Sequence, residues 1–404
     1  MQTNKTHWPS IFVLIILGFS AAFVLLISFG LSINSLIKLF TRGLDPAGGM
    51  ISSFAFGFDF VILLLSSWFV LKKTMRRKQA DRRIKIPFAV WQIIPVIGFV
   101  SISIILGGVA AYTEIAWLNW FVLPLLTLLV IVPPIWTLTG IGTNGIDLGP
   151  RWRVFSIIGL GMSISPMIMI VLEIALLVMI IITGMAIITL LQPELFQELL
   201  GLRQMLQHET ESDRILSLVA PYLANPIVIA TLLGFIAVLV PMIEELLKPL
   251  AVWIFVKRIE SPAQGFALGA ISGAAFALLE SLNASGDGST SWPVIVSIRA
   301  GTSLLHITSS GLVGWGIASA FQKKRVGRFF AAYFAAATIH GIWNACAVGA
   351  GISIIGNFIG KPEWIFNIIP AALCGMSVLG IGMLALLIAS NRKLRNATAA
   401  PIEE

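Results

Sequence analysis

The feature that most constrains this chain is a series of apolar segments, each long enough to cross a lipid bilayer. An α-helix rises about 1.5 Å per residue, so about 20 apolar residues span a hydrocarbon core of roughly 30 Å. We therefore predict an all-α fold, a polytopic transmembrane helix bundle of about ten spans. The ten predicted spans are 11–36, 50–71, 88–110, 115–138, 154–190, 226–256, 263–282, 293–321, 329–350 and 365–389.

Composition supports a membrane protein and argues against other classes. Hydrophobic residues make up 57% of the chain and charged residues 11%, against about a quarter charged in soluble domains. The net charge of +8 comes from short basic clusters between apolar segments, so we expect no nucleic-acid partner. Two cysteines, Cys346 and Cys374, are too few for a disulfide framework or a four-cysteine metal site.

The basic clusters also predict how the chain is oriented. Lysine and arginine concentrate in cytoplasmic loops of membrane proteins, and here they mark alternate loops, which places both termini in the cytoplasm. The clusters are 72–85, 151–153, 257–258, 323–328 and 392–395. The acidic segment 192–224 then faces outside. Its apolar residues recur at helical spacing and predict an amphipathic helix on the membrane surface: Leu195, Phe196, Leu199, Leu200, Leu202, Met205 and Leu206.

Three regions follow from these patterns. Residues 1–224 form an N-terminal region of about five spans plus the outer amphipathic loop, residues 225–350 hold four spans, and residues 351–404 hold the last span and a cytoplasmic tail. The predicted span 154–190 is overlong, so it tilts, breaks near Ser165-Pro166 or contains a re-entrant piece.

Charged and polar residues inside the spans of region 225–350 carry the functional signal. Each charge near the middle of a membrane helix costs roughly 2.5–3.5 kcal/mol, so such residues are paired or functional. Counted from the basic clusters at about 1.5 Å per residue, Glu244, Glu245, Glu280, His306, His340 and Asn344 share one slab between the midplane and the outer leaflet. Together with Lys248 and Arg299 they come from four spans, and they predict one common site.

This residue set fits the hydrolysis of an amide by more than one route. A carboxylate in an apolar cavity can take a proton from water and return it to the leaving amine. Two histidines and a carboxylate can instead bind Zn²⁺. Asn344, Arg299 or a protonated histidine can stabilise an oxyanion. The zinc-protease pattern H-E-x-x-H and the serine turn G-x-S-x-G do not occur, and Asp59 has no second intramembrane aspartate to form a dyad.

Four motifs resemble those of the PrsW family of intramembrane proteases. Glu244-Glu245-Leu246-Leu247-Lys248 matches the E-E-x-x-K signature, and the segment 273–280 resembles the second motif, which ends F-x-x-x-E at Glu280. His306, after Arg299, resembles the third, and His340 with Asn344 the fourth, H-x-x-x-N. The resemblance covers roughly residues 225–350.

The resemblance implies an endopeptidase of a prokaryotic cell membrane that cleaves membrane-anchored proteins, in the best-known case an anti-sigma factor. Its catalytic residues would be Glu244, Glu245, Glu280, His306, His340 and Asn344. Glu244 or Glu245 would activate water. The metal ligands would be His306, His340 and Glu280 if the enzyme uses Zn²⁺, and no cofactor would be needed if it is a glutamate protease.

Two alternatives from other classes are a proton- or cation-coupled transporter and a non-catalytic membrane scaffold. Buried carboxylates and histidines also build proton relays, although a transporter would show repeat symmetry with polar groups in both halves. In the simplest structural alternative, Glu244 and Glu245 form an ion pair with Lys248 that locks a helix. Asp59 and Glu173 have no partner visible in the sequence and stay unassigned.

Overall fold

The computed structural model describes residues 7–209, 211–223, 226–359 and 368–399, and helices dominate these ranges. Nine helical segments in them are long and apolar enough to cross a membrane. Together these findings confirm the predicted all-α polytopic class. The predicted span 329–350 falls on a long helix that is not among the nine, so this span and the orientation of both termini stay predictions.

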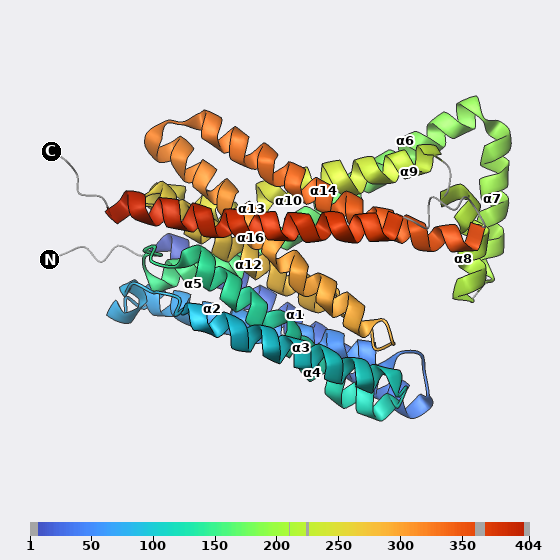
Figure 1. Ribbon diagram of the computed structural model, residues 1–404, viewed down its shortest axis with the longest axis horizontal. Coiled ribbons are helices and arrows are strands. Elements are labelled where there is room, and N and C mark those ends of the chain that lie inside the picture. The colour runs from blue at the N-terminus through green and yellow to red at the C-terminus, as the bar shows by residue number, and fades with distance from the viewer. Residues whose placement is uncertain (1–6, 210, 224–225, 360–367, 400–404) are drawn as a thin grey trace. The chain divides into compact units, whose positions relative to one another are not determined.

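The chain divides into two compact units, which we describe separately. The first unit consists of Met1–Pro166, Glu245–Ala336 and Gly382–Glu404. The second unit consists of Met167–Glu244 and Ala337–Ile381. Figure 1 labels the helices of both. Each unit therefore combines segments that lie far apart in the sequence.

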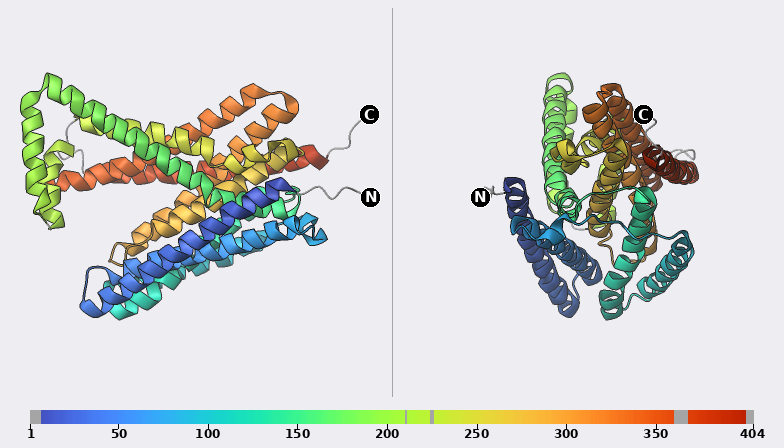
Figure 2. Two further views of the ribbon diagram at one scale, coloured as in Figure 1. Left: turned by 180° about the vertical axis from the view of Figure 1, so that it is seen from behind. Right: turned by 90° about the vertical axis from the view of Figure 1, so that its left-hand side faces the viewer.

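The first unit begins with the helices α1 (Trp8–Thr41) and α2 (Pro46–Thr74), which lie side by side with opposite directions (both blue in Figure 2). Two serines hold them together, because the hydroxyl of Ser28 donates to the carbonyl of Ser53 at 2.8 Å and the hydroxyl of Ser53 donates back to Ser28 at 2.8 Å. Each bond also satisfies a hydroxyl that would be costly to leave unpaired in an apolar surrounding.

The next helices of the first unit are α3 (Ile93–Tyr112) and α4 (Ala116–Thr143). Trp292 is fully buried beside both of them: its indole N–H donates to the Thr127 hydroxyl of α4 at 2.9 Å, and its ring lies where a side chain on Gly107 of α3 would stand. Helices α3 and α4 thus contact a tryptophan from the part of the sequence that holds the polar motifs.

The overlong span 154–190 is broken. Helix α5 (Arg151–Gly161) ends at Met162, whose N–H donates to the carbonyl of Ile158 at 3.0 Å, and α6 (Ile164–Leu191) begins two residues later. Pro166 falls in the first turn of α6, where its missing N–H breaks no helical hydrogen bond. Of the predicted alternatives, the structure has the break near Ser165-Pro166.

Helices α12 (Pro262–Asn283) and α13 (Trp292–Lys323) form the centre of the first unit and lie against each other along much of their length. The cause is a row of glycines spaced four residues apart on α12. A Cβ added to Gly265, Gly269 or Gly273 would come within 2.6 Å of a backbone carbonyl of α13. Backbone contact of this kind is typical of small residues at helix interfaces in membranes.

The second unit contains most of α6 and the helices α7 (Pro193–Gln207) and α8 (Ser212–Leu223), and α7 contains the apolar residues from which an amphipathic helix was predicted. Its position on the membrane surface stays a prediction. Three further helices contribute parts to this unit. They are α10 (Val240–Leu247), α14 (Val326–Ile359) and α16 (Ile368–Ala399). Helix α9 (Pro226–Gly234) and a π-helical turn over Phe235–Leu239 precede α10 and lie wholly in the second unit.

Candidate functional site

The close packing of α12 on α13 determines which polar side chains meet in the first unit. Gly273 of α12 lies directly against the carbonyl of His306 on α13. One turn further along α12, the Phe276 ring meets the His306 ring edge-on, with centroids 5.0 Å apart. One more turn brings Glu280 to both His306 and Arg299. The glycine row thus sets the register that lets Glu280 reach two cationic partners.

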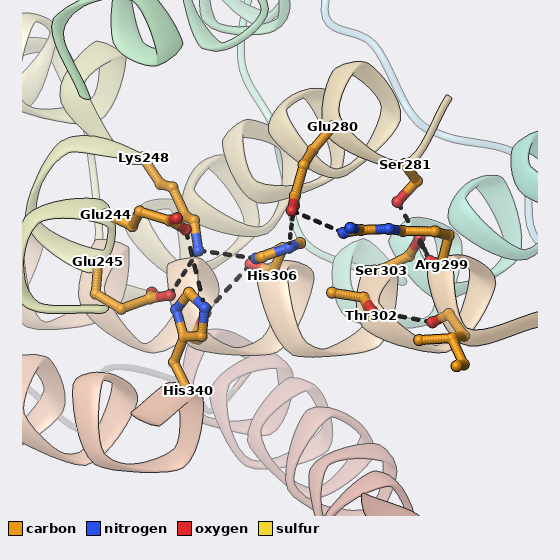
Figure 3. A network of polar contacts seen from close by, with 12 residues as sticks. Glu244, Glu245, Lys248, Glu280, Ser281, Arg299, Thr302, Ser303, His306 and His340 are labelled. Atoms are coloured by element: carbon orange, nitrogen blue, oxygen red, sulfur yellow. Dashed lines mark hydrogen bonds and ion pairs between the residues drawn. The ribbon is translucent and has the colours of Figure 1, made fainter. Parts of the chain in front are cut away.

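A continuous chain of polar contacts runs through the first unit (Figure 3). The Lys248 ammonium donates to Glu245 Oε1 at 2.8 Å and lies 2.8 Å from His306 Nδ1. His306 Nε2 lies 2.6 Å from Glu280 Oε2, and Arg299 donates to Glu280 Oε1 at 2.9 Å. Each charged side chain in this chain of contacts has at least one neighbour of opposite charge.

Lys248 is the most deeply enclosed member of this network. Both Lys248 and Glu245 have side chains with 0% exposure. The ammonium also lies 4.8 Å from the centre of the Phe276 ring, an attractive cation–π arrangement, and the Ser272 hydroxyl donates to the Lys248 carbonyl at 2.6 Å. Because a charged ammonium can only donate, the 2.8 Å contact makes His306 Nδ1 the acceptor and leaves the ring proton on Nε2, facing Glu280.

The other end of the network is open. About a third of each side chain is exposed at Glu280 (34%) and Arg299 (31%), whereas His306 is 2% exposed. The network therefore runs from the partly exposed Glu280 and Arg299, through the buried imidazole of His306, to the fully buried ion pair of Lys248 and Glu245. Such an arrangement holds the His306 ring in one orientation from both sides.

The second unit carries the remaining predicted residues. His340 is buried, and its Nε2 lies 3.9 Å from Glu244 Oε2. Asn344, one turn further along α14, donates its side-chain amide to the carbonyl of Ile236 at 2.9 Å. Ile236 belongs to the π-helical turn, whose wider hydrogen-bond spacing interrupts the regular α-helical ladder. Asn344 thus ties α14 to the turn that precedes Glu244.

Gly341 allows this approach, and a matched pair of substitutions tests its role. A Cβ on Gly341 would lie 2.2 Å from the Ala237 carbonyl, while one on Gly351 of the same helix would meet nothing within 4 Å. We expect Gly341→Ala to destabilise the protein by about 1–3 kcal/mol through overpacking and to reduce activity, since it separates α14 from the turn. Gly351→Ala should be neutral or slightly stabilising. Thermal unfolding in micelles compares the two, and equal melting temperatures would contradict the contact.

The predicted site residues therefore fall into two groups. Glu245, Glu280 and His306 share the network of the first unit, and Glu244, His340 and Asn344 lie together in the second. Glu244 and Glu245 are consecutive residues of α10. That all six act in one site is a prediction of the sequence and is taken up below as a proposal.

The structure adds residues that the sequence left without a role. Asp59 of α2 has a partner after all: the Asn283 amide at the end of α12 donates to its Oδ2 at 3.0 Å. Asn283 stands three residues after Glu280, so this bond attaches α2 to the helix end that carries the open carboxylate. Ser272 and Phe276 also contact Lys248, and their four-residue spacing on one face of α12 was the only sequence signal for them. Glu173 lies in the second unit and stays unassigned.

Comparison with known proteins agrees with the motifs. The family model of the PrsW family intramembrane metalloproteases matches residues 149–369, which is more than half of the chain. The match extends beyond the range 225–350 on both sides and includes every predicted site residue. No curated protein and no solved structure matches the chain. The chain therefore belongs to the PrsW family of intramembrane metalloproteases and is a membrane-embedded peptide hydrolase.

Proposed function

We propose that Glu244 activates the water that attacks a peptide bond of a membrane-anchored substrate. The observation that carries this choice is the difference between the two adjacent carboxylates. Glu245 has a side chain with 0% exposure and accepts from Lys248, whereas the Glu244 side chain is 14% exposed and lies 3.9 Å from His340. A general base must be able to reach a water molecule, which a carboxylate with a fully buried side chain cannot do. Glu244 is therefore the better placed of the two carboxylates.

Glu245 then has a different task. Its bond to Lys248 keeps the ammonium beside His306 Nδ1, and the ammonium in turn fixes which nitrogen of His306 carries the proton. The protonated Nε2 of His306 then faces Oε2 of Glu280. Arg299 holds the other oxygen of Glu280, Oε1. We assign Glu245, Lys248 and Arg299 as positioning residues, because they act through His306 and Glu280.

A metal ion fits the chemistry of the predicted residues, and we propose Zn²⁺. Imidazole and carboxylate groups are common zinc ligands, and the family is described as metalloproteases. The proposed ligands are the set predicted from the sequence motifs, His306, His340 and Glu280. Both nitrogens of His306 already have partners, so binding the ion would replace either the Lys248 contact at Nδ1 or the Glu280 contact at Nε2. When bound, the metal would polarise the carbonyl and lower the pKa of the attacking water.

The substrate is, in this proposal, a single-span membrane protein of a prokaryotic cell membrane, such as an anti-sigma-factor-like protein. Its helix has to unwind locally, because helical hydrogen bonds shield the peptide carbonyls from attack. Arg299 stands at the open end of the network, where a guanidinium can donate to an exposed carbonyl or to the developing oxyanion. Asn344 already donates to Ile236, so we assign it to holding His340 in place.

Reconstitution tests the proposal. The purified full chain is placed in lipid vesicles with candidate single-span proteins, and cleavage is followed with and without a zinc chelator. We expect about one zinc ion per chain by elemental analysis, loss of cleavage with the chelator and recovery when zinc returns. Cleavage by metal-free protein that no chelator affects would overturn the zinc proposal and leave Glu244 as the base of a glutamate protease.

A further inference from the structure

A cavity lies in the first unit at the helix ends that carry basic clusters. Its volume is about 610 Å³, and it lies between the beginnings of α12 and α14 and the ends of α13 and α16. None of the predicted catalytic residues lines it. Its lining residues are Glu260, Ser261, Pro262, Ala263, Phe266, Leu312, Trp315, Gln322, Lys323, Arg328, Ser390, Lys393, Leu394 and Ala397.

The polar part of this lining is strongly positive. Lys323, Arg328 and Lys393 contribute three cations from three different helices. Glu260 is the one acidic side chain among the lining residues, so the three cations outnumber it. The first turn of α12 also lies here, with Ser261 as its N-cap, and the positive end of a helix dipole attracts anions. The polar groups therefore favour a ligand with at least one negative charge.

The rest of the lining is apolar. Phe266 is fully buried, Leu312 and Leu394 are half-buried, and the Arg328 guanidinium lies 5.5 Å from the centre of the Trp315 ring. A free inorganic anion would gain nothing from these walls. A molecule with an anionic head and a hydrocarbon tail would use both parts of the cavity.

Hydrogen bonds between residues far apart in the sequence hold the helix ends that form the cavity. Asn391 of α16 donates its amide to the carbonyls of Gly142 at 2.9 Å and Asn144 at 3.0 Å, two residues before Lys393. Gln322 of α13 donates to the carbonyl of Ile259, next to Glu260. The cavity is thus fixed before any ligand arrives, which lowers the entropic cost of binding.

We infer that this cavity binds an anionic phospholipid, with its phosphate between Lys323, Arg328 and Lys393 and its hydrocarbon part along Phe266, Leu312 and Leu394. The basic clusters predict that these helix ends face the cytoplasm, and anionic lipids are attracted to basic pockets between membrane helices on that side. The bidentate donors of an arginine suit a phosphate particularly well. This binding site is independent of the proposed catalytic chemistry.

The test measures lipid binding to the full chain in neutral detergent. Phosphatidylglycerol is titrated and the bound lipid is counted by native mass spectrometry, with phosphatidylcholine and inorganic phosphate as competing probes. The variant Lys323→Gln/Arg328→Gln/Lys393→Gln is compared with a control that removes three exposed basic groups from the loop 72–85, Arg77→Gln/Lys78→Gln/Arg82→Gln. Both triple variants remove three positive charges from the side of the protein that is predicted to face the cytoplasm.

We expect the cavity variant to bind phosphatidylglycerol at least about tenfold more weakly than wild type, and the control to bind like wild type. Lys393→Glu alone, at an exposed position of α16, should weaken binding in the same direction without the risk of misfolding. Equal binding by all variants, or equal wild-type affinity for phosphatidylcholine, would overturn the inference. Displacement by inorganic phosphate at similar concentration would identify a free-anion site and overturn the lipid assignment.

Discussion

Glu244→Gln is expected to lower the rate of substrate cleavage by about 10²-fold or more, the usual contribution of a general base. The amide is close in size to the carboxylate but cannot accept a proton from water at neutral pH. Insertion and thermal stability should stay close to wild type, because the Glu244 side chain is partly exposed and glutamine has nearly the same size. Initial rates of cleavage in vesicles measure the effect.

The control for Glu244→Gln is Glu114→Gln, the same change at an exposed loop position outside the proposed site. It should cleave at the wild-type rate. Near-wild-type cleavage by Glu244→Gln would show that another group activates water. If Glu245→Gln alone abolished cleavage while leaving stability unchanged, the roles proposed for the two carboxylates would be reversed.

Lys248→Met is expected to destabilise the protein by about 3–5 kcal/mol, the cost of leaving a buried charge without its partner. Glu245 would keep a carboxylate with a fully buried side chain and lose the hydrogen bond at 2.8 Å. The double substitution Glu245→Gln/Lys248→Met removes both charges and should recover much of the lost stability. The stabilities of Lys248→Met, Glu245→Gln and the double variant are measured by unfolding in detergent micelles. Lys257→Met, at an exposed basic position, is the control.

Activity separates a structural role of Lys248 from a positioning role. The double variant should be nearly as stable as wild type yet cleave slowly, because no ammonium then determines which nitrogen of His306 carries the proton. A shifted dependence of the cleavage rate on pH is expected together with the lower rate. Strictly additive losses of stability in the two single variants would contradict the pairing, and full activity in the double variant would contradict the positioning role.

The sequence predicted the helical class because long apolar runs leave few alternatives in a membrane. It also identified the residues of the first-unit network, since Glu280, Arg299 and His306 fall on facing sides of two glycine-spaced helices. The four-residue glycine spacing on α12 is a pattern that allows two membrane helices to approach closely. Local spacing, in short, revealed the faces of individual helices.

Other contacts could not be derived from spacing. Helix α10 ends at Leu247, one residue before Lys248, and neighbours at i,i+3 and i,i+4 share one helix face, so a helical wheel cannot say which carboxylate meets Lys248. The i,i+4 pattern joins Lys248 with Glu244, whereas the ion pair at 2.8 Å in the first unit is with Glu245 at i,i+3. The Asp59–Asn283 bond joins residues 224 positions apart, and nothing local in the sequence indicates it.

The most direct test of the central claim is to map where a single-span substrate is cut by the purified chain in lipid vesicles. Mass spectrometry of the products gives the position of the new termini for wild type and for Glu244→Gln. We predict one or a few cuts inside or at the edge of the substrate's apolar segment, made by wild type and lost in Glu244→Gln. Cleavage confined to soluble parts of the substrate, or cuts that persist in the variant, would contradict an intramembrane peptidase in which Glu244 activates water.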